Sequence, residues 1–291
     1  MKKGPGIARL SGLVMLLLIG GGFAAIGASP VDAQARIRAY GRTGRMSRPS
    51  REGLPTAQNG VVDRGFTFCR LLYQSVTREQ RGQGWSTDYP NSDHNFTVRF
   101  EELTTVQPSE WADGEPGYAV VRAGQRELYE CPFLFMSDAG TVGLSQEEVE
   151  SLRDYLLKGG LIWADDFWGE RAWRRFAGEM ARVLPEYSMV DIGPDHMIMH
   201  ALYQVPDIPQ VPSIQFWRQT QFTTSEMGAE SATPHLRGIF DEAGNPLVLA
   251  THNTDIGDGW EREGEDIDFF YTFSPRSYAL GINVLLFVMS H

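Results

Sequence analysis

The sequence has little cysteine, with only Cys69 and Cys131 among 291 residues. A zinc ribbon needs four soft ligands, or histidines at fixed spacing, so two cysteines exclude one. In an oxidising compartment the pair could form a disulfide, because each cysteine precedes or lies in a predicted strand. We favour two buried free thiols over that pairing.

Long apolar runs are also scarce, and the main one lies near the N-terminus, at residues 10–28. Basic residues precede this run, and Ala33-Gln34-Ala35 follows it as a small-x-small cleavage site. This order predicts a signal peptide over residues 1–35, with export to the periplasm or the cell exterior. A retained membrane anchor is the alternative, and the glycines inside the run argue against it. We expect no other membrane contact, because every later apolar run is short and broken by charge.

Positive charge is scarce outside one short segment. The chain has a net charge of −11. A basic arm nevertheless follows the cleavage site, and its arginines are Arg36, Arg38, Arg42, Arg45, Arg48 and Arg51. The remaining chain is therefore more acidic than the whole, which argues against a nucleic-acid partner. Composition predicts a disordered linker over residues 36–60, with contact to a cell-envelope protein, lipid or polymer as the alternative.

Residues 61–291 are expected to form one domain. Short apolar runs predict buried strands at residues 66–73, 131–136, 161–164 and 246–251. A helix is predicted from a capping box at Ser145 and Glu148 to Gly159-Gly160, and others at residues 170–184 and 278–289. Turn formers predict loops at residues 85–96 and 252–260. A strand, a helix and a second strand form a right-handed βαβ unit, so the fold class is α/β with an open parallel sheet.

Several motifs occur in a fixed order along this domain. They are residues 85–90, 144–148 running to 159–160, 165–169, 195–196, 253–260 and 281–291. Together they resemble the DUF4159 family, which is grouped with the class I glutamine-amidotransferase-like and ThuA-like fold. The resemblance implies a three-layer α/β sandwich with an open, mostly parallel sheet of flavodoxin-like topology. It implies no reaction, because the family has no established one.

The nucleophiles of related enzymes are missing. Class I amidotransferases place a cysteine in a Gly-x-Cys-x-Gly turn after a buried strand, whereas here the strand at 161–164 leads into Asp165-Asp166. A carboxylate cannot attack a glutamine amide as a thiolate does, so we expect no glutaminase activity. Ser137 also follows a strand, but its flanks lack the Gly-x-Ser-x-Gly elbow of serine hydrolases.

Polar side chains at the ends of predicted strands indicate a ligand site. The candidates are Asp165, Asp166, Trp168, Ser137, Asp138, Trp85, Asp88, Asn253 and Asp255. Open α/β sheets bind ligands outside the carboxyl ends of their strands. Adjacent carboxylates raise a pKa or attract a cation, and aromatic rings beside carboxylates suit a sugar. Each residue alone could equally cap a helix or stabilise a turn.

His196 and His200 suggest a metal site, because residues four apart share one face of a helix. With Asp166 they could hold a divalent metal ion. The sequence thus favours an exported, noncatalytic or weakly catalytic module that binds a polar ligand, such as a sugar or a cell-envelope fragment. One alternative is a metal-dependent hydrolase with an aspartate as general base. Another is a structural partner in a cell-envelope complex.

Overall fold

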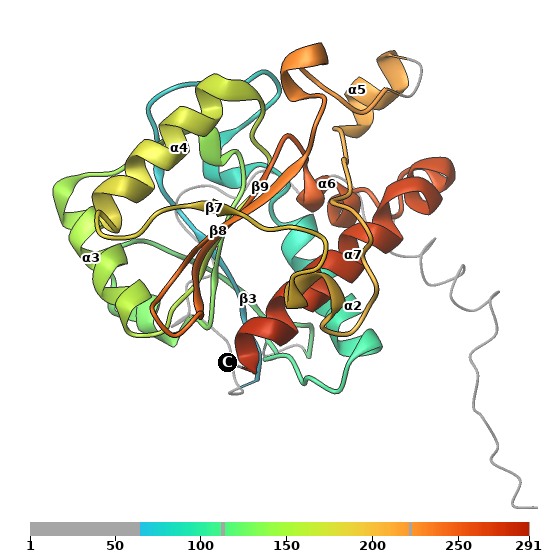
Figure 1. Ribbon diagram of the computed structural model, residues 1–291. Helices are drawn as coiled ribbons and strands as arrows, with labels where there is room; N and C mark the ends of the chain where they lie inside the picture. The colour runs from blue at the N-terminus through green and yellow to red at the C-terminus, as the bar shows by residue number, and fades with distance from the viewer. Residues whose placement is uncertain (1–64, 112–113, 221–222, 291) are drawn as a thin grey trace, which may run out of the picture.

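The computed structural model describes residues 65–111, 114–220 and 223–290 (Figure 1). The predicted signal peptide and arginine-rich linker lie outside the described residues. The strands are β1 (Phe68–Leu71), β2 (Gln74–Ser75), β3 (Tyr118–Val121), β4 (Leu134–Met136), β5 (Val142–Gly143), β6 (Ile162–Ala164), β7 (Val190–Asp191), β8 (His235–Phe240) and β9 (Pro246–His252). The α-helices are α2 (Asn91–Leu103), α3 (Gln146–Leu157), α4 (Gly169–Val183), α5 (Ile214–Gln219), α6 (Ile256–Glu261) and α7 (Ile267–Met289). Short 3₁₀ helices are η1 (Gly84–Ser86), η2 (Arg126–Glu130), η3 (Ala139–Thr141), η4 (Met197–His200) and η5 (Gly228–Ser231).

The main sheet has seven strands in the order β3-β1-β4-β6-β9-β8-β7. The first five run parallel; at one edge β8 pairs antiparallel with β9, and β7 pairs antiparallel with β8. In chain order the parallel strands read 2-1-3-4-5, which is the flavodoxin-like arrangement. The predicted α/β fold with a mostly parallel sheet is confirmed. In this arrangement the switch point between β1 and β4 is where ligands bind, outside the carboxyl ends of the strands.

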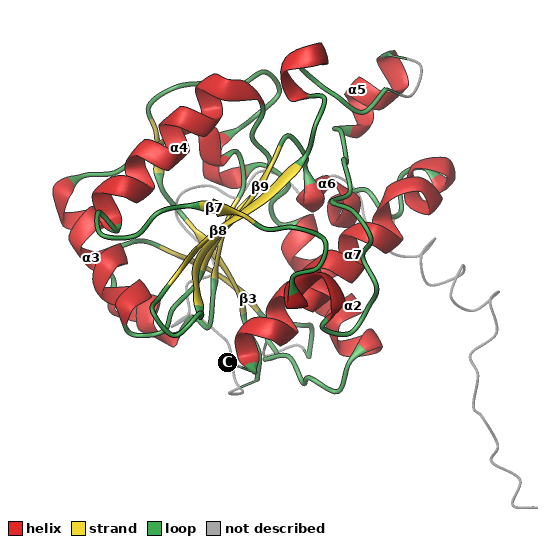
Figure 2. Cartoon of the chain, in the orientation of Figure 1, coloured by secondary structure: helices red, strands yellow, loops and turns green. Residues whose placement is uncertain are grey.

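Helices cover both faces of the sheet, so the domain has three layers (Figure 2). Helices α3 and α4 pack on one face, and α2, α6 and α7 pack on the other (Figure 1). Side chains alternate between the two faces along each strand, as the pleat requires. In β1, Cys69 and Leu71 enter the core under α3 and α4, whereas Phe68 enters the core under α2 and α7. Among the described residues, no helix is both long and apolar enough to cross a bilayer.

The most accurately predicted element is α3. The Ser145 hydroxyl accepts a hydrogen bond from the Glu148 backbone N–H, and the Glu148 carboxylate accepts one from the Ser145 N–H. The chain leaves the helix through Gly159 at a φ of 94°, a conformation that glycine adopts without steric cost. The strands expected at 131–136, 161–164 and 246–251 and the helix expected at 170–184 are also present, with shifted ends.

Three helices differ from the prediction. Helix α2 begins at Asn91, inside the predicted loop 85–96, and α6 begins at Ile256, inside the predicted loop 252–260. Their turn-forming residues are buried and bonded to the rest of the fold, and this tertiary context overrides local propensity. Helix α7 begins at Ile267 rather than at residue 278, because Phe269 and Phe273 pack against Trp217.

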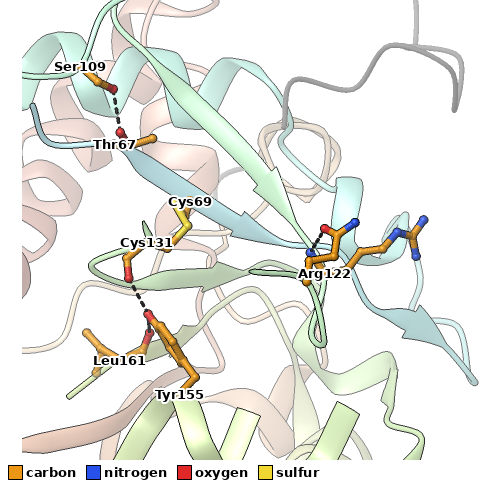
Figure 3. The surroundings of a disulfide bond; sticks show 8 residues. Thr67, Cys69, Ser109, Arg122, Cys131, Tyr155 and Leu161 are labelled. Atoms are coloured by element: carbon orange, nitrogen blue, oxygen red, sulfur yellow. Dashed lines mark hydrogen bonds between the residues drawn. A yellow bond between two sulfur atoms is a disulfide. The ribbon is translucent and has the colours of Figure 1, made fainter. Parts of the chain in front are cut away.

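Cys69 and Cys131 form a disulfide, so the prediction of two free thiols is wrong (Figure 3). The chain enters β4 beside β1, which brings the two Cα atoms to 5.9 Å, within the usual range for a disulfide. The Tyr155 hydroxyl from α3 donates a hydrogen bond to the Cys131 carbonyl (Figure 3). The disulfide thus links β1 to the segment that leads into β4, near the amino ends of these two strands.

Candidate functional site

A cavity of about 1120 Å³ lies at the carboxyl ends of the parallel strands, beside the switch point between β1 and β4. Part of its wall comes from residues 75–90, which connect β2 to α2. The other walls follow β4, β6 and β9 or come from α5 and the residues that flank it. Most of the charged lining is acidic: Glu79, Glu226, Asp88, Asp138, Asp166, Asp255, Asp258 and Glu261. The fold therefore concentrates carboxylates where open α/β sheets keep their ligands.

Six of the nine ligand candidates taken from the sequence line this cavity. They are Trp85, Asp88, Asp138, Asp166, Trp168 and Asp255. The other three, Ser137, Asp165 and Asn253, are buried behind the wall and position its residues. The Ser137 hydroxyl, fully buried, donates to the Asp88 carboxylate at 2.8 Å. Asn253 bonds to the Gly169 N–H and the Thr233 carbonyl through its side-chain amide.

Asp165 and Asp166 are adjacent in sequence but their carboxylates have separate environments. One Asp165 oxygen accepts from the Thr251 hydroxyl at 2.5 Å, and the other accepts from the Gly257 N–H at 2.8 Å. These bonds tie the end of β6 to β9 and to the start of α6. Asp166 lines the cavity and accepts a hydrogen bond from the Trp168 indole N–H at 3.2 Å. Asp165 is therefore a positioning residue, and Asp166 is the one available to a ligand.

Three of the lining aspartates have left-handed backbone conformations. The φ values are 64° at Asp88, 52° at Asp138 and 53° at Asp166. Such values are uncommon outside glycine, although aspartate tolerates them better than most residues. Asp138 and Asp166 each lie two positions after the last residue of a strand, β4 and β6 respectively. The sharp change of direction turns each side chain toward the cavity instead of continuing the strand.

Two overlapping carboxylate groups form the acidic wall. In one, oxygen atoms of Asp88, Asp166 and Asp255 all lie within 4.8 Å of one another. In the other, oxygens of Asp88, Asp258 and Glu261 do so. Two carboxylate charges at that distance repel by about 3 kcal/mol at an effective dielectric constant of about 20. Three such charges coexist only if protons or a cation offset them.

The pKa values of the first group reflect this crowding. Burial raises the pKa of Asp88 to about 7, with the charge of Asp258 adding to the effect and Arg70 opposing it. Burial also raises the pKa of Asp166 and Asp255 well above the usual range for aspartate. The neighbouring charges that act on Asp166 and Asp255 are acidic, so they raise each pKa further.

The second group has a basic partner. The Arg262 Nε lies 3.2 Å from an Asp258 oxygen and 2.9 Å from a Glu261 oxygen. Burial and the charges of Asp88 and Asp258 nevertheless raise the pKa of Glu261 to about 9, with Arg262 opposing the shift. The guanidinium offsets part of the charge of this second group. Asp166 and Asp255 have no comparable ion pair among the described residues.

The matching family model describes a domain of unknown function, DUF4159, and covers residues 67–289. This chain belongs to the DUF4159 family. The matched residues include every residue that lines the cavity. A search of curated proteins finds no match to the chain.

The DUF4159 domain does not assemble the metal ligands expected from the histidines. His196 is the N-cap residue of the 3₁₀ helix η4, and its ring accepts a hydrogen bond from the Ile198 N–H. The same ring packs against Phe240 and Phe287. His200 is exposed and contacts Gln204. Phe240 pairs with Pro246 at the start of β9. His196 therefore lies near the amino end of β9, whereas the cavity lies at the carboxyl ends of the strands. The two histidines therefore do not share one face of an α-helix, as their spacing predicted.

Four acidic residues of the DUF4159 cavity are not among the candidates taken from the sequence: Glu79, Glu226, Asp258 and Glu261. Asp258 and Glu261 follow Asp255 at intervals of three residues, which places them on one helical face. Reading residues 252–260 as a loop hid that spacing, although Asp255 caps α6 by accepting from the Asp258 N–H. Glu79 lies in a loop and contacts the wall only in the folded chain, where it accepts from the Trp168 N–H.

Glu79 gives a pH-dependent prediction about stability. Burial raises its pKa to about 8, and the charges of Asp138 and Glu226 add to the shift. The folded chain therefore keeps a proton that the unfolded chain releases near the ordinary pKa of glutamate. Stability conferred by that proton is complete at low pH and declines as the pH rises toward about 8. We expect the Tm to fall by several degrees between about pH 5 and about pH 8.

The variant Glu79→Gln should show a smaller decline, measured by thermal unfolding across that range. Glutamine keeps an oxygen that accepts from the Trp168 N–H but does not ionise. Glu242→Gln, at an exposed position, is the control and should follow the wild type. An unchanged pH profile in Glu79→Gln contradicts the assignment of this proton to Glu79.

Proposed function

We propose that this DUF4159 protein is an exported module whose acidic cavity binds a polar ligand rich in hydrogen-bond donors, such as a sugar or a cell-envelope fragment. The observation that carries the proposal is the cavity of about 1120 Å³ with its carboxylate wall and two tryptophans. Its volume suits a ligand of several sugar units, because pockets for drug-sized ligands have about 300–1,000 Å³. Carboxylates accept hydrogen bonds from hydroxyl and ammonium groups.

The aromatic lining supports a ring-shaped ligand. Trp85 is half-buried at the cavity wall, with its ring 5.6 Å from that of Tyr89. Trp168 lines the same cavity two residues after Asp166, and its indole N–H donates a hydrogen bond to the Asp166 carboxylate. Flat apolar rings beside acceptors can stack on a sugar face while the carboxylates bind its polar edge.

Export is part of the proposal, and two features support it. The N-terminal residues have the charge, apolar run and cleavage site of a signal peptide. The Cys69–Cys131 disulfide is of the kind that persists in oxidising compartments such as the periplasm. The carboxylate wall would meet soluble glycans or envelope polymers there.

Calorimetry with two oligosaccharide probes tests the ligand class. A β-1,4-linked glucosamine tetramer carries ammonium groups, whereas the matching glucose tetramer is neutral. We expect the glucosamine tetramer to bind more tightly at physiological salt, where nonspecific attraction is screened. Trp85→Ala should weaken binding by about tenfold or more, as loss of a central aromatic contact does.

The control is Trp111→Ala, since Trp111 packs against Tyr118 outside the cavity lining. It should bind the glucosamine tetramer as the wild type does. Two results contradict the proposal: no binding of either probe up to about 1 mM, or binding that Trp85→Ala leaves unchanged.

A further inference from the structure

Three carboxylates of the cavity wall have a geometry suited to a cation. Asp88 comes from the loop before α2, Asp166 follows β6, and Asp255 follows β9. Their ligand oxygens lie within 4.8 Å of one another, and all three residues are buried. Oxygen donors on a common ion are separated by distances of this size, because each lies about 2.0–2.6 Å from the metal.

Each of these carboxylates is held in place by a donor from the protein. Asp88 accepts from the Ser137 hydroxyl, Asp166 from the Trp168 indole N–H, and Asp255 from the Asp258 backbone N–H. Such outer contacts fix the orientation of metal ligands in known sites. The wall is therefore built so that the three acidic groups converge although they repel.

A separate observation is a buried acceptor without a donor in the same cavity. Asp138, only 2% exposed, lines the same cavity, and its charge acts on Asp166. One Asp138 oxygen accepts from the Gly84 N–H at 2.6 Å. The other oxygen, Oδ1, has no hydrogen-bond partner among the described residues. A buried acceptor without a donor indicates an ion or water that belongs to the site.

We propose that Asp88, Asp166 and Asp255 bind one divalent cation of the oxygen-preferring class, Mg²⁺, Mn²⁺ or Ca²⁺. The ligands are all carboxylates, which favours these ions over zinc or copper. The neighbouring group of Asp88, Asp258 and Glu261 is the weaker candidate, because Arg262 already offsets its charge. This site goes beyond the polar-ligand proposal and does not depend on it.

The test uses purified protein that is stripped with a chelator and then titrated with Mn²⁺. Free Mn²⁺ is followed by electron paramagnetic resonance, and Mg²⁺ and Ca²⁺ are titrated by calorimetry. We expect one Mn²⁺ per chain. Asp166→Asn and Asp255→Asn should each weaken binding by more than about 100-fold, since loss of an outer contact alone costs 10–100-fold.

These two variants separate loss of the ion from loss of the fold. Asparagine keeps the oxygen that accepts from Trp168 or from Asp258, so both hydrogen bonds persist. Without metal and at alkaline pH, each variant should melt at a higher temperature than the wild type, because the wild-type carboxyl group must there either keep its proton or repel its neighbours. Asp195→Asn, an exposed residue near His196, is the matched control and should bind Mn²⁺ normally.

Trp85→Ala should also bind Mn²⁺ normally, which distinguishes failure of this proposal from failure of the sugar proposal. The cation site is refuted if the wild type binds no Mn²⁺, Mg²⁺ or Ca²⁺ up to about 1 mM, the weak end for extracellular sites. It is equally refuted if Asp166→Asn and Asp255→Asn bind the ion as tightly as the wild type, since the ion then lies elsewhere.

Discussion

Reduction of the Cys69–Cys131 disulfide is expected to lower the Tm by about 10 °C. The bond closes a loop between residues 62 positions apart. Constraining a loop of that length removes enough unfolded-state entropy to stabilise the fold by about 4 kcal/mol. For a domain of this size, 1 kcal/mol corresponds to about 2–4 °C.

Thermal unfolding with and without a reductant measures this effect. The double variant Cys69→Ala/Cys131→Ala should melt near the reduced wild type and should not respond to reductant. Both cysteines are buried, so the alanines also leave a small cavity, and the variant should be slightly the less stable of the two. A wild type whose Tm changes by less than about 2 °C on reduction contradicts the predicted stabilisation.

Replacing Arg70 with methionine should destabilise the protein by about 3–5 kcal/mol. Arg70 lies in β1 and is fully buried, as is its ion-pair partner Asp93 in α2. Its guanidinium also donates to the backbone carbonyls of Trp85 and Thr87 and to the Ser92 hydroxyl. The substitution leaves a buried aspartate without a counter-charge and two carbonyls without a donor.

Arg70→Met should also weaken Mn²⁺ binding in the cavity. Asp88 lies between the carbonyls that Arg70 binds and the start of α2, so loss of the guanidinium should displace its carboxylate. Denaturant unfolding measures the stability, and the Mn²⁺ titration measures the site. Arg174→Met is the control: Arg174 forms an exposed pair with Glu170 on α4, worth about 0.3–0.5 kcal/mol.

A second substitution separates the two effects of Arg70. In Arg70→Met/Asp93→Leu no buried charge is left alone, so stability should recover in part. Ion binding should not recover, because the carbonyls of Trp85 and Thr87 still lack their donor. If Arg70→Met alone is as stable as Arg174→Met, the prediction is contradicted, and the buried ion pair does not hold the loop that carries Trp85 and Thr87.

Residues that act within one element could be predicted from the sequence. The capping box of α3 depends on Ser145 and Glu148, three positions apart. The apolar runs around β4, β6 and β9 mark strands that are buried on both faces. Because parallel strands present their carboxyl ends at one edge, the candidates following them could be assigned to one site, and Asp138, Asp166 and Asp255 do line one cavity.

Errors arose where a residue's role depends on distant segments. Cys69 and Cys131 pair because β1 and β4 are neighbours, and their spacing in sequence does not reveal that. Their spacing predicts His196 and His200 on one α-helical face, but the chain there forms a 3₁₀ helix, and the His196 ring packs against Phe240 and Phe287. Glu79 lacks any local signal and meets Trp168 only through folding.

The sequence by itself determined the fold class and the edge of the sheet at which polar groups gather. Hydrophobic periodicity and capping are local, and parallel strands always end on the same side. Only the tertiary structure decided which carboxylates converge. The direction of a side chain after a strand depends on one backbone torsion and on its buried partners, so Asp165 turns into hydrogen bonds with Thr251 and Gly257 while Asp166 faces the cavity.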